Sequence, residues 1–130
     1  MNDRAAEEFA LLRRRWADLV HEPSGDWILI PVYPLPDGWN NDRVGVAFQL
    51  PALLPGQAPY GFYARDPLSY RGQHPSNYTF PAQAGTVPFA GDWGQFSWTP
   101  DPWQPGSRPH DGSNMVQFAA SFARRFEEGT

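Results

Sequence analysis

Three side chains in the carboxyl-terminal part of the sequence carry the functional groups of a nucleophilic catalytic site. Ser97 offers a hydroxyl, and His110 is followed directly by Asp111. A serine attacks a carbonyl only when a histidine takes its proton and an acid orients that histidine. The sequence therefore allows a hydrolase or transferase that uses Ser97, His110 and Asp111. The alternative is a hydroxyl that hydrogen-bonds the backbone of its own loop, a common role for serine.

The chain contains no cysteine, and this excludes several kinds of site. Without a thiolate there can be no cysteine nucleophile, no thiolate zinc site and no disulfide. The three histidines, His21, His74 and His110, match no zinc-ligand spacing. We therefore expect neither a metal site nor a cofactor.

Aromatic side chains gather in the proline-rich stretch GQFSWTPDPWQPG and just before it. Aromatic clusters are frequent at the centres of protein interfaces, so we expect Trp93, Phe96 and an exposed Trp98 to contact a partner. A buried Trp103, together with Pro105, is expected to anchor the stretch. Its prolines lower the conformational freedom of the unfolded chain, so ordering it costs less. An alternative function is a carbohydrate-binding module, in which tryptophan rings stack on sugars.

The elements that position these residues follow from the hydrophobic pattern. Apolar side chains at helical spacing predict a first helix over about residues 3–20. Nearly continuous or alternating apolar runs predict strands at residues 27–33, 44–50 and 61–64. Short turns separate these strands, so we expect them to pair antiparallel in sequence order.

The second half of the chain has little regular pattern before its end. Residues 66–109 show no period, apart from one short strand expected in GQFSW. A final helix is expected over residues 114–127, where Met115, Phe122 and Phe126 recur at helical spacing. Residues 1–130 thus form one α+β domain, with an N-terminal helix, a meander of three or four antiparallel strands, a long irregular region and a C-terminal helix.

This order, with several stretches of sequence, resembles the ubiquitin-conjugating-enzyme (UBC) superfamily. The closest similarity is to a bacterial branch, the prokaryotic UBC-like family E group. The stretches that carry it are DWILIPVYPLPDGWN, VAFQLPALLPGQAPYGFYARDPL, and WGQFSW followed by WQPG. The resemblance covers about residues 25–127 and implies a UBC-like fold.

The resemblance also implies where a catalytic cysteine would lie. In the superfamily a cysteine accepts a ubiquitin-like tail as a thioester, and a Trp-x-Pro motif and a helix follow it. The equivalent position here lies shortly before Trp103, in a stretch that reads Phe-Ser-Trp-Thr at residues 96–99. The segment from His74 to Asn77, HPSN, is a loose match to the superfamily's His-Pro-Asn motif with one residue inserted.

The function implied is that of a UBC-like protein without thioester chemistry. Such a protein would be a binding or adaptor component of a bacterial ubiquitin-like conjugation or antiviral system. Its partner would be a ubiquitin-like protein, an activating enzyme or a protease of that system. The net charge of −4 gives no basic footprint for nucleic acid. The sequence shows neither a signal-peptide pattern nor a membrane-length apolar run, so we expect a cytoplasmic protein that binds no membrane.

Overall fold

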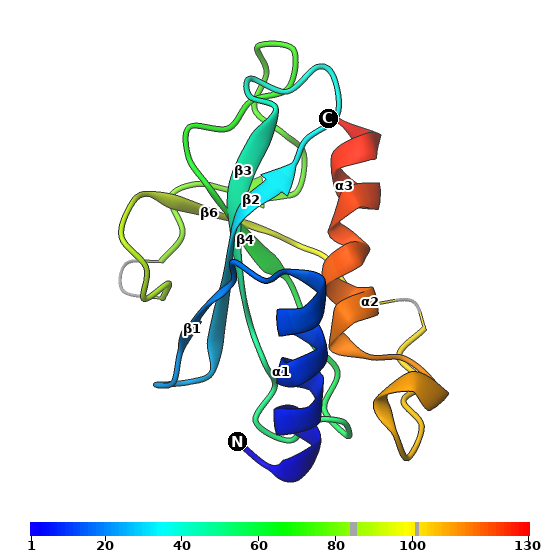
Figure 1. Ribbon diagram of the computed structural model, residues 1–130. Helices are drawn as coiled ribbons and strands as arrows, with labels where there is room; N and C mark the ends of the chain where they lie inside the picture. Colours follow the sequence, from blue (N-terminus) through cyan, green and yellow to red (C-terminus); the bar gives the residue numbers. More distant parts are fainter. Residues whose placement is uncertain (84–85, 101) are drawn as a thin grey trace.

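An antiparallel sheet forms the centre of the fold, and the helices cover one of its faces (Figure 1). The computed structural model describes residues 1–83, 86–100 and 102–130. The elements, in chain order, are α1 (Asp3–Arg15), β1 (Val20–Glu22), β2 (Trp27–Pro34), β3 (Arg43–Gln49), β4 (Phe62–Arg65), β5 (Tyr78–Thr79), β6 (Trp93–Phe96), the 3-10 helix η1 (Pro109–Asp111), α2 (Met115–Ala120) and α3 (Phe122–Glu128).

The sheet has the strand order β1-β2-β3-β4-β6-β5, and every neighbouring pair is antiparallel. The predicted consecutive pairing of the strands near residues 27–33, 44–50 and 61–64 is confirmed, as is the short strand in GQFSW. The sheet is wider than the three or four strands expected. β1 has three residues and β5 has two, which is too short to show an alternating pattern in the sequence.

The first helix is shorter than predicted, because it ends at Arg15 rather than near residue 20. Asn2 caps its start by accepting a hydrogen bond from the Ala5 N–H. Beyond the helix the chain turns, and strand β1 begins at Val20. The side chains of Trp16 and Leu19, on either side of this turn, are still buried in the core. The apolar spacing therefore identified core residues correctly but extended the helix too far.

The single C-terminal helix expected over residues 114–127 is broken at Ser121 into α2 and α3. The hydroxyl of Tyr33, from strand β2, lies at the break. It donates to the Ala119 carbonyl at 2.7 Å and accepts from the Ala123 N–H at 3.1 Å. In a continuous helix these two backbone groups bond each other directly, so the inserted hydroxyl accounts for the bend.

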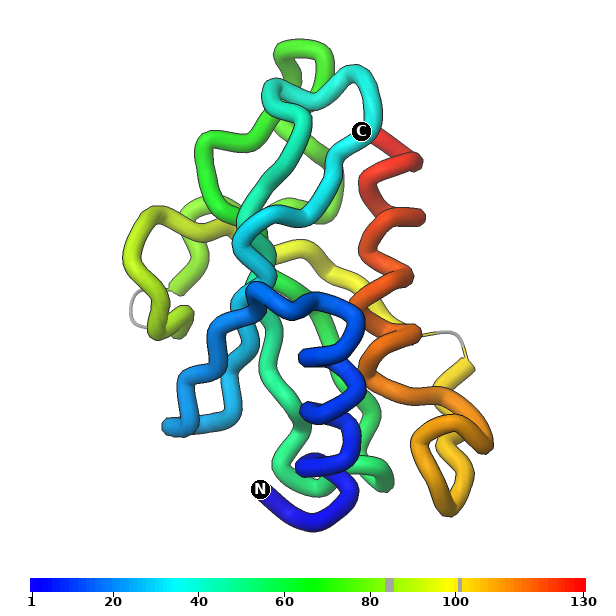
Figure 2. Tube along the Cα trace, in the orientation of Figure 1, coloured from blue at the N-terminus to red at the C-terminus, as the bar shows by residue number. Residues whose placement is uncertain are grey.

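Aromatic side chains fill the core between the sheet and the helices. The rings of Phe62 and Phe122 stack with centroids 3.9 Å apart, and Phe96 and Phe126 pack around them. The opposite face of the sheet carries a second cluster, built on Trp27, Ala47 and Trp93. Figure 2 shows residues 80–83 and 86–92, in yellow-green, on this side of the sheet, and Ala82, Val87 and Phe89 from these residues pack on the second cluster.

Candidate functional site

The surface that the sequence analysis singled out lies where strand β6 ends. Residues Ser97, Trp98 and Thr99 leave the sheet beside Tyr60, and the four line an open hollow of about 250 Å³. The backbone N–H of Gly61 donates to the Trp98 carbonyl at 2.7 Å, which fixes the two segments against each other. Tyr60 is 62% exposed, so its ring is available at the edge of the hollow.

Trp98 is held in one place from the side of the helices. Its indole Nε1–H donates to the Ser121 hydroxyl at 2.9 Å, at the break between α2 and α3. The Arg124 guanidinium carbon lies 5.9 Å from the centre of the Trp98 ring. The indole is half-buried and packs against the core, so it is less exposed than the sequence suggested. Its exposed part is therefore a fixed aromatic surface.

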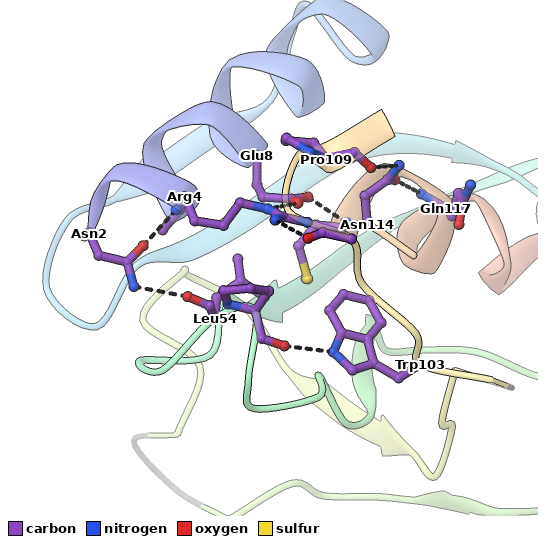
Figure 3. Close-up of polar contacts among 12 residues, drawn as sticks. Asn2, Arg4, Glu8, Leu54, Trp103, Pro109, Asn114 and Gln117 are labelled. Atoms are coloured by element: carbon purple, nitrogen blue, oxygen red, sulfur yellow. Dashed lines mark hydrogen bonds and ion pairs between the residues drawn. The ribbon is translucent and has the colours of Figure 1, made fainter. Parts of the chain in front are cut away.

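Trp103 has the contacts of a loop anchor, although it is half-buried rather than fully buried. Its ring packs against the core, and its indole Nε1–H donates to the Pro55 carbonyl at 2.9 Å (Figure 3). Pro105 is also half-buried. The predicted contrast between a buried Trp103 and an exposed Trp98 is therefore wrong, because each ring is half-buried and each indole N–H is bonded within the protein.

Two of the expected partner contacts lie inside the protein. Phe96 is 0% exposed and packs in the aromatic core beneath the helices. Trp93 is 6% exposed and belongs to the cluster on the other face of the sheet, against which Ala82, Val87 and Phe89 pack. This corrects the prediction, because neither side chain has surface to offer a partner. Alternate residues of β6 point to opposite faces, and both faces are covered at this strand.

The three candidate catalytic residues do not come together. Ser97 is exposed and shares its hollow with Tyr60, Trp98 and Thr99. His110 lines a different hollow, formed between η1 and helix α1. His110 and Asp111 are both exposed, with Nε2 and Oδ1 3.8 Å apart, too far for a hydrogen bond. His110 and Asp111 therefore do not provide Ser97 with a histidine base.

The HPSN segment lies beside Ser97, although Asn77 and Ser97 are 20 positions apart in the sequence. The Ser97 N–H donates to the Asn77 carbonyl at 3.0 Å, one step beyond the pairing of Tyr78 with Phe96. Asn77 itself has a φ of 58°, a left-handed conformation that asparagine tolerates better than most residues. No pattern in the sequence predicts this contact, because it depends on strand β5, which has only two residues.

A buried arginine supports the same segment from the C-terminal helix. Arg125 is 1% exposed, and its guanidinium donates to the Gly129 carbonyl at 2.9 Å and to the Ser76 carbonyl. The guanidinium also lies 4.6 Å from the centre of the Phe96 ring. Burial lowers the pKa of Arg125, while Glu128 acts in the opposite direction. Arg125 thus connects α3, the HPSN segment and the strand that leads to Ser97.

A second polar network secures the loop that follows the candidate surface (Figure 3). Glu8 is fully buried, pairs with Arg4 at 2.8 Å and accepts the first N–H of helix α2, from Met115, at 2.7 Å. Arg4 also donates to the Gly106 carbonyl at 2.8 Å. The role of Glu8 in joining α1 to α2 depends on tertiary contact.

Comparisons with known proteins do not identify a family. No protein-family model matches the chain, and neither the curated proteins nor the solved structures contain a match. Among the residues that the structure describes, no helix is long and apolar enough to cross a membrane. The same residues contain no group of three or more His, Asp or Glu side chains placed to hold a metal ion.

Proposed function

We propose that this chain is a cysteine-less UBC-like domain that binds a partner protein and carries no thioester. The binding surface consists of Tyr60, Ser97, Trp98 and Thr99. One observation carries the proposal: the position shortly before Trp103, where the superfamily has its cysteine, holds an exposed serine beside a fixed indole and an exposed tyrosine. The chain contains no cysteine that could replace this serine.

The arrangement of elements supports the UBC-like part of the proposal. A helix precedes a meander of antiparallel strands, and the C-terminal helices lie on the same face of the sheet as α1 (Figure 1). The HPSN segment also lies against Ser97, as a His-Pro-Asn motif would lie near a catalytic cysteine. By the resemblance, the partner is a ubiquitin-like protein, an activating enzyme or a protease of a bacterial conjugation or antiviral system. Cytoplasmic residence belongs to the same proposal.

The other two functions have less support. A hydrolase would need a base beside Ser97, but His110 lines another hollow and neither His110 nor Asp111 lines the hollow of Ser97. A carbohydrate-binding module needs free tryptophan faces, but four of the six tryptophans are buried. The remaining two, Trp98 and Trp103, are half-buried with their indole N–H groups bonded inside the protein.

The proposal is tested by titrating the isotopically labelled chain with a ubiquitin-like protein and, separately, with an activating enzyme of a bacterial conjugation system. We expect the NMR signals of Tyr60, Ser97, Trp98 and Thr99 to change with one of them. Tyr60→Ala should weaken binding about tenfold or more, because exposed aromatic anchors dominate interface energies. Phe80→Ala is the matched control, since Phe80 is another exposed aromatic, at 41%, and lines a different hollow. Binding that depends on Phe80 and not on Tyr60 would refute the proposed surface.

A further inference from the structure

The break between α2 and α3 lies directly beneath the proposed binding surface. Ser121, the residue at the break, accepts the hydrogen bond from the Trp98 indole at 2.9 Å. The Ser121 hydroxyl in turn donates to the Phe118 carbonyl at 2.6 Å. A serine that bonds back to the preceding turn of its helix bends that helix. Trp98 therefore holds Ser121 in the rotamer that favours the bend.

The buried side of the same break is held by Tyr33. Its hydroxyl lies between the Ala119 carbonyl and the Ala123 N–H, at 2.7 Å and 3.1 Å. Tyr33 is 3% exposed, and its ring packs against Phe122 and Phe126 of α3. Two side chains from different parts of the chain thus stabilise one bent backbone, one from the surface and one from the core.

We propose that this bend is a relay between the partner-binding surface and the core. Trp98 and Tyr33 both stabilise the same bent backbone. If one of these side chains loses its hydrogen bond, the bent backbone becomes less stable, and the hydrogen bonds that the other side chain makes to it weaken. A partner that draws the Trp98 indole N–H away from Ser121 would loosen the buried backbone of residues 119–123. The partner part of this inference rests on the proposed function, whereas the link between Trp98 and the bend does not.

Trp103 provides a matched control inside the same protein. It is also half-buried, and its indole N–H also donates a hydrogen bond of 2.9 Å. The acceptor is the Pro55 carbonyl, in the loop between β3 and β4, and not a group in α2 or α3. Trp103 lines one hollow together with Phe118 and Ser121, so Trp103→Phe alters a ring of the same size beside the break. It deletes an indole hydrogen bond of the same kind but leaves the bond between Trp98 and the Ser121 hydroxyl in place.

The test compares amide hydrogen exchange in Trp98→Phe, Ser121→Ala and Trp103→Phe, each in the free protein. We expect the Ala123 amide, which bonds Tyr33, to exchange about fivefold faster in the first two variants, the effect of losing one hydrogen bond. In Trp103→Phe its exchange should stay within about twofold of the parent protein. Unchanged exchange in Trp98→Phe and Ser121→Ala would overturn the relay. Equal acceleration in Trp103→Phe would also overturn it, because the effect would then be a general loosening.

The reverse direction gives a second readout, because coupling between two sites is reciprocal. Tyr33→Phe removes only the buried hydroxyl, and we expect the indole N–H signal of Trp98 to move while that of Trp103 stays in place. A fixed Trp98 signal would contradict the relay. Both experiments use the chain without a partner, so their failure leaves the proposed binding function standing, and a failure to bind leaves the relay standing.

Discussion

At the scale of single residues, the contacts of the buried polar side chains are the feature that the sequence predicts least. Glu7 and Glu8 are adjacent acids near the start of α1, yet Glu7 is exposed and Glu8 is fully buried. The Glu8 carboxylate serves two partners, the Arg4 guanidinium and the first N–H of α2. One carboxylate thus connects two helices that are distant in sequence.

Replacing Glu8 should be far more harmful than replacing its neighbour. Glu8→Ala leaves the Arg4 charge buried without its partner and the Met115 N–H without an acceptor. We expect the free energy of unfolding to fall by about 3–5 kcal/mol. Glu7→Ala, an exposed control, should change it by less than about 0.5 kcal/mol. Urea unfolding of both variants measures the difference, and similar values for the two would show that the buried pair is dispensable.

Buried tyrosines predict a loss of stability in alkaline solution. Burial raises the pKa of Tyr33 to about 12, and it raises the pKa of Tyr78, where the Asp66 carboxylate adds to the effect. A raised pKa means that the folded protein favours the neutral form. The contribution of Tyr33 is therefore fully present below about pH 10, the pKa of an unfolded tyrosine, and is lost as the pH rises toward 12.

The expected loss from Tyr33 alone is about 3 kcal/mol over that range, at about 1.4 kcal/mol for each pKa unit. Unfolding by urea at pH values from 8 to 11 would follow the onset of this loss. In Tyr33→Phe the midpoint should start lower, because two hydrogen bonds are gone, but it should fall less steeply with pH. A parent protein whose midpoint stays constant from pH 9 to pH 11 would contradict the assignment.

At the scale of elements, the short strand β5 decides how the candidate surface is assembled. It brings the HPSN segment to the end of β6, where Asn77 and Ser97 share a hydrogen bond. The pairing requires Gly94, because a Cβ at that position would overlap the Tyr78 ring. The pairing of β5 with β6 thus depends on one small residue, Gly94 of β6.

We expect Gly94→Ala to separate β5 from β6 and to lower the unfolding free energy by about 1–3 kcal/mol through overpacking. The NMR signals of Asn77 and Ser97 should move with it. Gly56→Ala is the control, since a Cβ at that position meets only the Leu53 carbonyl at an ordinary distance. If Gly94→Ala leaves the Asn77 and Ser97 signals in place, β5 does not position the surface.

At the scale of the whole molecule, the absence of cysteine determines the chemistry. Incubated with an activating enzyme, ATP and a ubiquitin-like protein, the chain should form no adduct that dithiothreitol removes, because a serine cannot form a thioester. Such an adduct on the natural chain would contradict the proposal. The proposed equivalence of positions adds a second expectation, that Ser97→Cys gains an adduct while Ser107→Cys, at another exposed serine, does not.

The sequence by itself determined the fold class and the antiparallel pairing of the central strands, and it placed Phe122 and Phe126 on one face of the final helix. These features depend on local apolar periodicity, which a chain displays whatever its long-range contacts are. The sequence also determined, from composition alone, that no thiolate chemistry is available. It predicted a contrast in burial between Trp98 and Trp103 that the structure does not have, and it did not distinguish exposed Ser97 from buried Phe96, because exposure within a proline-rich stretch has no period.

Only the tertiary structure decided which residues meet. The Tyr33 hydroxyl bonds the Ala119 carbonyl of α2 from a strand 86 positions earlier, and Glu8 caps α2 from 107 positions earlier. Strand β5 has two residues, too few for any pattern, yet it places Asn77 against Ser97. Each of these contacts depends on how the helices and the sheet pack in space. A sequence lists the hydroxyls, carboxylates and indoles available, but the packing of distant segments selects their partners.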